Sequence, residues 1–173
     1  TDMLSSFDSN GFTVGNATNT GSSADFVAWC WYAPTSQSVS ASGSILASTI
    51  KRNVDGGFSI VTWTGNGQGA ARIGHGIDTP DMVITKSTSL VNDWGVAHVG
   101  MPNKIAYLQS SNAAFSGGGT NGAFGYQSTN TSTTFGFTGG SSGVNNVNKL
   151  NSNYIAYCFH SVPGYSRIGR YEG

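Results

Sequence analysis

The chain has 173 residues, which is enough for one complete domain. Its formal net charge is zero and only 9% of its residues are charged, so no field of one sign attracts nucleic acid or an anionic membrane. No run of about 18 apolar residues occurs, and we therefore expect no membrane insertion.

Short strands joined by turns are the structure that the composition predicts. Glu172 is the only glutamate, the chain holds 25 glycines, and 12% of its residues are aromatic, so helix formers are scarce while a core can still be buried. We expect an all-β fold, an antiparallel β-sandwich of the jelly-roll kind. In chain order, strands are predicted at 10–14, 25–32, 58–64, 70–73, 81–86, 93–99, 104–109, 133–137, 153–160 and 165–171, with one more possible over 45–50.

An internal echo is the most informative pattern. Residues 26–31 read Phe-Val-Ala-Trp-Cys-Trp, and residues 154–159 read Tyr-Ile-Ala-Tyr-Cys-Phe. Each copy follows a glycine-spaced aromatic segment, at 11–15 and 135–139, and Gly-Phe-Ser at 57–59 is answered by Gly-Tyr-Ser at 164–166. The spacing of roughly 107 residues between the Gly57 and Gly164 copies suits tandem β-sandwich domains.

The echo divides the chain into tandem repeat fragments. Residues 1–33 are predicted to be the C-terminal strands of a preceding repeat, and 34–56 a serine-rich connection. Residues 57–162 form one complete sandwich, and 163–173 open a following repeat. We therefore expect the chain to be a piece of a larger protein.

The predicted strand at 25–32 is apolar on both faces. Because side chains alternate across a sheet, Ala28 and Cys30 lie on one face, and Trp29 and Trp31 lie on the other. A strand of this kind is expected to be central in a sandwich or covered by another domain or chain. Cys30 and Cys158 hold matched places in two copies of this strand, so we expect buried free thiols and no disulfide between them.

Several segments together resemble a known family. They read Leu-Ser-Ser-Phe-Asp-Ser-Asn-Gly-Phe-Thr-Val-Gly at 4–15, the echo at 26–31, Gly-Phe-Ser-Ile-Val-Thr-Trp-Thr-Gly at 57–65, Gly-His-Gly at 74–76 before Pro80, Asp-Trp-Gly-Val-Ala-His at 93–98, and the segment from 154 to 166. This order resembles a repeated domain of marine tailed-phage structural proteins, cyanophage ones especially. The resemblance implies a domain of poorly defined function, often repeated and often beside a concanavalin-like lectin domain. It supplies no catalytic residues.

The polar residues do not predict a reaction. His75, Asp78 and Asp81 come close in the sequence, but Pro80 interrupts them, and a metal site needs three or more converging ligands on a rigid frame. One glutamate and seven aspartates, most at turns, do not indicate the paired carboxylates of a glycosidase. We expect no enzyme activity, no metal and no cofactor.

Sugar binding is the ligand chemistry that the sequence keeps open, because lectin sites stack an aromatic face on the sugar and hold its hydroxyls with Asn, Asp and backbone groups. The aromatic candidates beside polar loops are Trp63, Trp94, Tyr107 and Tyr126. Each of them is also a candidate for the core or for an interdomain contact. The glycine- and serine-rich segment 110–132 is where we expect recognition if the chain performs any.

The expected function is a structural or attachment module of a tailed-bacteriophage virion, in the tail fibre. It would act as a rigid spacer or present a host-binding surface. The expected partners are other virion proteins and further copies of the chain, with a homotrimer favoured. The protein would be assembled in the host cytoplasm and exposed on the particle exterior. Two alternatives remain: a carbohydrate-binding module for host surface glycans, and a capsid-surface decoration protein.

Overall fold

A computed structural model describes residues 4–15, 25, 27–37, 43–45, 47–69, 71–102, 104–116, 130–136 and 147–171. The chain divides into two compact units, Thr1–Cys30 and Trp31–Gly173. No helix occurs in these described ranges, so none there is long and apolar enough to cross a bilayer.

The first unit contains a single hairpin among its described residues. Strand β1 (Leu4–Asp8) pairs antiparallel with β2 (Gly11–Val14), and Phe7 lies opposite Phe12. The Asp8 carboxylate accepts hydrogen bonds from the hydroxyls of Ser6 at 3.0 Å and Thr13 at 2.9 Å. Every residue of both strands is exposed, and Phe7 is the most open of their apolar side chains at 84%.

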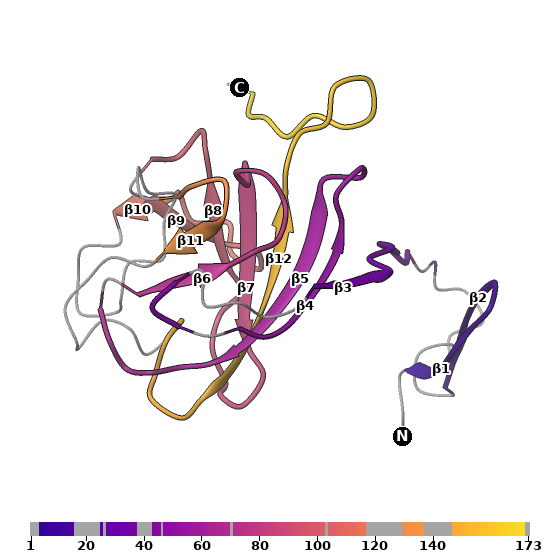
Figure 1. Ribbon diagram of the computed structural model, residues 1–173, viewed down its shortest axis with the longest axis horizontal. Coiled ribbons are helices and arrows are strands. Elements are labelled where there is room, and N and C mark those ends of the chain that lie inside the picture. The colour runs from indigo at the N-terminus through magenta and orange to yellow at the C-terminus, as the bar shows by residue number, and fades with distance from the viewer. Residues whose placement is uncertain are drawn as a thin grey trace. The chain divides into compact units, whose positions relative to one another are not determined.

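The second unit is built on a large antiparallel sheet (Figure 1). Among the described residues it has eight strands in the order β10-β9-β8-β7-β12-β5-β4-β3. Their bounds are β3 Thr35–Gln37, β4 Ala47–Asn53, β5 Phe58–Thr64, β7 Met82–Ser87, β8 Gly95–His98, β9 Lys104–Tyr107, β10 Phe115–Ser116 and β12 Asn153–Phe159. Strand β12 lies at the centre and pairs with β5 along its whole length and with β7 from Tyr154 to Phe159.

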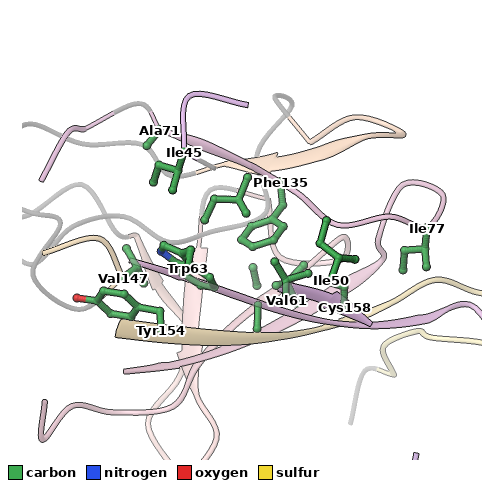
Figure 2. Packing of buried hydrophobic residues seen from close by; sticks show 14 of the residues in the cluster. Ile45, Ile50, Val61, Trp63, Ala71, Ile77, Phe135, Val147, Tyr154 and Cys158 are labelled. Atoms are coloured by element: carbon green, nitrogen blue, oxygen red, sulfur yellow. The ribbon is translucent and has the colours of Figure 1, made fainter. Parts of the chain in front are cut away.

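A smaller second layer covers one face of this sheet. Strand β6 (Arg72–Gly74) pairs with β11 (Thr134–Gly136), and an isolated bridge joins Ile45 to Ile73. Figure 2 shows Phe135 pointing toward Trp63 and Val61 of β5; its ring meets the Trp63 ring edge-on, with the centroids 5.9 Å apart. The Arg52 Nη1 atom of β4 donates to the Gly76 carbonyl at 2.8 Å and ties the layers together. The predicted all-β sandwich is confirmed.

The core between the layers follows from alternation along the strands. Every second residue of the central strands points inward, and these positions are apolar or small. The buried apolar cluster consists of Ile45, Ile50, Val61, Trp63, Ala71, Ile73, Ile77, Val83, Ala97, Ile105, Phe135, Val147, Tyr154, Ala156 and Cys158.

Two predicted strands are wrong. Asp25 and residues 27–32 form no strand, and Val27, Trp29 and Tyr32 are exposed. Segment 165–171 contains only the isolated bridge from Val162 to Ser166. Both segments contain aromatic and β-branched residues of the kind that strands favour, but a strand needs a hydrogen-bonding neighbour, and the described residues supply none. The division of the chain into repeats stays a prediction.

Candidate functional site: the outer face of the large sheet

The face of the large sheet that points away from the core carries a row of apolar side chains flanked by polar ones such as Lys51, Thr62 and Lys86. In β12, Tyr154, Ala156 and Cys158 are buried at 0–1% exposure. Their neighbours Ile155, Tyr157 and Phe159 point to the opposite side and are half-buried. We call this side the outer face, and it carries apolar side chains that the described residues only partly cover.

The outer face extends across four strands. The register places Tyr157 between Ile60 of β5 and Ile84 of β7, and Ile84 lies opposite Val96 of β8. All four side chains are half-buried. Cross-strand pairs of this kind lie on the same side of a sheet, so they form one continuous apolar row.

Three aromatic rings close one end of the outer face. Phe58 lies opposite Phe159, and their ring centroids are 5.0 Å apart. The Trp31 ring stacks on Phe58 at 5.9 Å and meets Phe159 edge-on at 5.7 Å. Phe58 is 4% exposed, whereas Trp31 is 51% exposed. Trp31 therefore shields Phe58 and remains half exposed itself.

A second aromatic pair lies beside polar groups. The half-buried Trp94 stacks on Tyr157 with a centroid distance of 6.4 Å and an interplanar angle of 25°. Gln109 accepts from the Trp94 backbone N–H at 3.2 Å and donates through Nε2 to the Asp93 carboxylate. An aromatic ring next to a carboxylate and an amide is the combination that sugar sites use.

The four aromatic residues predicted from the sequence do not gather in one place. Trp63 is 1% exposed and stacks on Tyr154 at 5.3 Å, so it belongs to the core and presents no face to a ligand. Tyr107 is half-buried and packs against the same core. Trp94 alone lies on the outer face, and Tyr126 lies outside the described residues.

His75 is buried and fully used by the backbone. Its Nε2 atom donates to the Thr131 carbonyl at 3.1 Å, and its Nδ1 atom accepts from the Ile77 N–H at 3.3 Å. This pattern requires the neutral imidazole with its proton on Nε2. Burial lowers the pKa of His75, because the charged form would lose its hydration.

The neighbouring carboxylates also hold the backbone. Asp78 Oδ1 accepts from the Thr79 N–H, and Asp81 Oδ2 accepts from the Ser161 N–H, both at 2.7 Å. His160 Nδ1 donates to the Thr79 carbonyl at 3.0 Å and lies 3.9 Å from Asp81 Oδ2. In the part of the chain that the structure describes, no three His, Cys, Asp or Glu side chains group as metal ligands.

The two cysteines differ sharply. Cys158 is buried in β12, and burial raises the pKa of its thiol to about 12, while the Ser59 hydroxyl opposes that shift in part. This confirms the prediction of a buried free thiol at this position. Cys30 is also free but exposed, so its predicted burial is wrong. Cys30 is exposed for the same reason that 27–32 forms no strand: no strand of the described residues pairs with this segment.

Sequence reasoning missed most of the outer face. Ile60, Ile84 and Tyr157 received no functional interpretation, although their strands alternate apolar residues on both sides. The signal that indicates this face is the two-sided apolar pattern of 25–32, which recurs at 154–159 and is typical of a strand with two apolar faces.

Comparisons with known proteins place the chain in one family and go no further. A family profile described as a domain of unknown function, DUF7483, matches residues 1–173. No curated protein matches the chain, and neither does any solved structure.

Proposed function

We propose that this chain, which belongs to the DUF7483 family of domains of unknown function, is a non-catalytic structural or attachment module of a tailed-phage virion, in the tail fibre. Its role there is to act as a rigid spacer or to present a host-binding surface. The proposal joins the resemblance of its motifs to phage structural repeats with the chemistry of the outer face.

The continuous apolar row on the outer face carries this proposal. Side chains from β5, β12, β7 and β8 line it, and Trp31 adds a half-open ring at one end. Soluble monomers rarely leave such a row uncovered, because association removes it from water. A second layer of virion protein on this face, supplied by two further copies in a trimer, would bury it.

The non-catalytic part of the proposal is supported by how the acid–base groups are used. His75, Asp81 and His160 each hold a backbone group in the loops beside β7 and β12. These hydrogen bonds give the three groups a structural role in the loops, which is the role that a non-catalytic module requires of them.

The assembly surface is tested by the mass of the protein in solution. We expect light scattering to give a homotrimer for the wild type and a monomer for the double variant Ile60→Lys, Ile84→Lys, because two ammonium groups would lie inside the interface. Val91→Lys is the matched control, since Val91 is fully exposed in the segment between β7 and β8 and belongs to neither strand. A wild-type monomer, or a trimer that survives the double substitution, contradicts this surface.

The place in the particle is tested by immunogold electron microscopy. Antibodies against the chain should label the tail fibres of the phage that encodes it. Labelling of the head surface would instead support the capsid-decoration alternative. Absence of label from purified particles would contradict both.

Carbohydrate binding is the second candidate, favoured by Trp94 with Asp93 and Gln109 beside it. On a glycan array, this function predicts a defined set of bound sugars that disappears with Trp94→Ala. Tyr165→Ala is the control, because Tyr165 is an exposed aromatic residue far from this group in sequence. An array without binding, or binding that Trp94→Ala leaves unchanged, contradicts it.

A further inference from the structure

Two segments of the chain match residue by residue but lie in different surroundings. Residues 26–31 and 154–159 share Ala and Cys at the same places, with aromatic or β-branched residues around them. The second segment is strand β12, the centre of the large sheet. The first is not part of any strand in the described residues.

The surroundings of β12 show what this pattern requires. Ala156 lies between Val61 of β5 and Thr85 of β7, and Cys158 lies between Ser59 and Val83. Both are 0% exposed, while the alternate residues Ile155 and Tyr157 are half-buried. Small residues at the inner positions let the second layer approach, and large residues at the outer positions make the outer face.

The matching segment, residues 27–31, has neither the paired strands nor the burial of β12 in the described part of the chain. Val27 is 80% exposed and Trp29 is 78% exposed, although these residues match Ile155 and Tyr157. The residues of the preceding hairpin β1–β2 are also exposed, and Phe7 reaches 84%. A two-stranded hairpin is marginally stable alone, so this end of the chain needs a sheet to join.

The opposite end of the repeat has matching backbone geometry. Gly57 before β5 has a φ of 64°, and the corresponding Gly164 has a φ of 77°. A Cβ on Gly57 would lie 2.3 Å from the His160 carbonyl oxygen at the end of β12, whereas nothing lies within 4 Å of one on Gly164. Gly67 and Gly76 have similar φ values, so the match between 57 and 164 rests on the sequence Gly-aromatic-Ser, and no described residue lies against Gly164 as His160 lies against Gly57.

We propose that the hairpin β1–β2 and residues 27–31 close a second β-sandwich, whose remaining strands come from a neighbouring unit of the same repeat type. In that unit, the segment at 27–31 takes the place of β12 between a β5-type and a β7-type strand. Ala28 and Cys30 face its core, and Val27 and Trp29 face outward. The partner is therefore a β-sandwich of this repeat type whose central strand is supplied by residues 27–31.

A graft into the full chain tests whether the segment is a β12-type strand. Copying the 26–31 sequence onto 154–159 needs only Tyr154→Phe, Ile155→Val, Tyr157→Trp and Phe159→Trp. We expect a cooperatively unfolding β protein whose Tm falls by roughly 5–10 °C, mainly from loss of the Tyr154 hydroxyl that accepts from the Lys149 N–H at 3.0 Å.

The control is the same graft shifted by one residue, which copies 27–32 onto the same positions. It introduces Ala156→Trp and Cys158→Trp at two fully buried sites, and we expect no cooperative unfolding. If the in-register graft unfolds as completely as the shifted one, the assignment is wrong.

A tandem chain tests the partner. A copy of residues 34–123 placed before Thr1 supplies β5-type and β7-type strands with no β12 of their own. We expect amide hydrogen exchange at 27–31 to slow by roughly tenfold or more relative to the single chain. Ala28→Asp should abolish this protection, because the matching Ala156 is fully buried. Equal exchange in the tandem and single chains, or protection that Ala28→Asp does not change, overturns the proposal.

Discussion

Both faces of the large sheet carry rows of apolar side chains, yet the described residues seal only one of them. On the inner face, Ala156 and Cys158 have no exposed surface, and Trp63 has 1%. On the outer face, Tyr157, Ile84 and Ile60 remain half-buried. The difference arises because β6 and β11 cover the inner face with residues from distant parts of the chain. Apolar content therefore marks both faces as surfaces to be covered, and the tertiary fold covers one.

A carboxylate on each face of the same strand would separate them most strongly. Ala156→Asp places an unpaired charge in the core and should destabilise the fold by about 5 kcal/mol or more. The adjacent Ile155→Asp places it at the half-open outer face and should cost about 1–2 kcal/mol. Urea denaturation of both variants measures the difference. Similar losses of stability would mean that the two faces are covered alike.

Two tryptophans give the next largest contrast. Trp63→Ala removes a ring packed between Tyr154 and Phe135, and should destabilise the fold by about 3–5 kcal/mol. Trp94→Ala removes a ring that stacks on Tyr157 at the outer face and should cost about 1 kcal/mol. The midpoints of thermal unfolding, with calorimetric enthalpies, compare them. An outer-face loss equal to that of Trp63 would contradict the placement of the core.

The dependence of stability on pH should report the sealed His75. Its folded pKa is lowered by burial, so the unfolded chain binds the proton first. The stability is therefore complete above the unfolded pKa of about 6.5 and falls as the pH drops through it, by at most about 1.4 kcal/mol per pH unit. His75→Gln should flatten this part of the profile. A stability that rises on acidification between pH 7 and 5.5 would contradict a buried neutral His75.

The smallest expected contrast is in the reactivity of the two thiols, and its measurement does not change the stability of the fold. A water-soluble disulfide reagent should label only Cys30 in the native protein and both cysteines in urea, because Cys158 lies on the inner face with a thiol pKa of about 12. The Cys30→Ser variant provides the control and should show no native labelling. Rapid labelling of Cys158 in that variant would show that the inner face opens readily.

Much of the large sheet could be predicted because its signal is local. The strands at 58–64 and 153–160 are confirmed within one residue, and those at 81–86 and 104–109 within two. Each segment has β-branched or aromatic residues at strand spacing, a pattern that predicts a strand without knowledge of the strand it pairs with. The same reading failed at 25–32, where the pattern is present and the pairing partner is not.

The candidate site was less predictable, because a local pattern does not say which face of a strand another layer will cover. Trp63 and Trp94 both stand beside polar loops in the sequence, but one faces β11 and the other faces outward. The sequence places Tyr157 in a strand that is expected to be buried. Only its cross-strand neighbours show that its side chain lies on the outer face.

Read in order, the chain already shows the composition that predicts an all-β class and the local patterns that predict the main strands. The likeness between 26–31 and 154–159 is also a property of the sequence alone. Tertiary structure alone decided which apolar face is sealed, which tryptophan is core, and which copy of the matched segment becomes a strand. Those outcomes depend on β-pairing and on packing between residues far apart in the chain, and neither is encoded in any one segment.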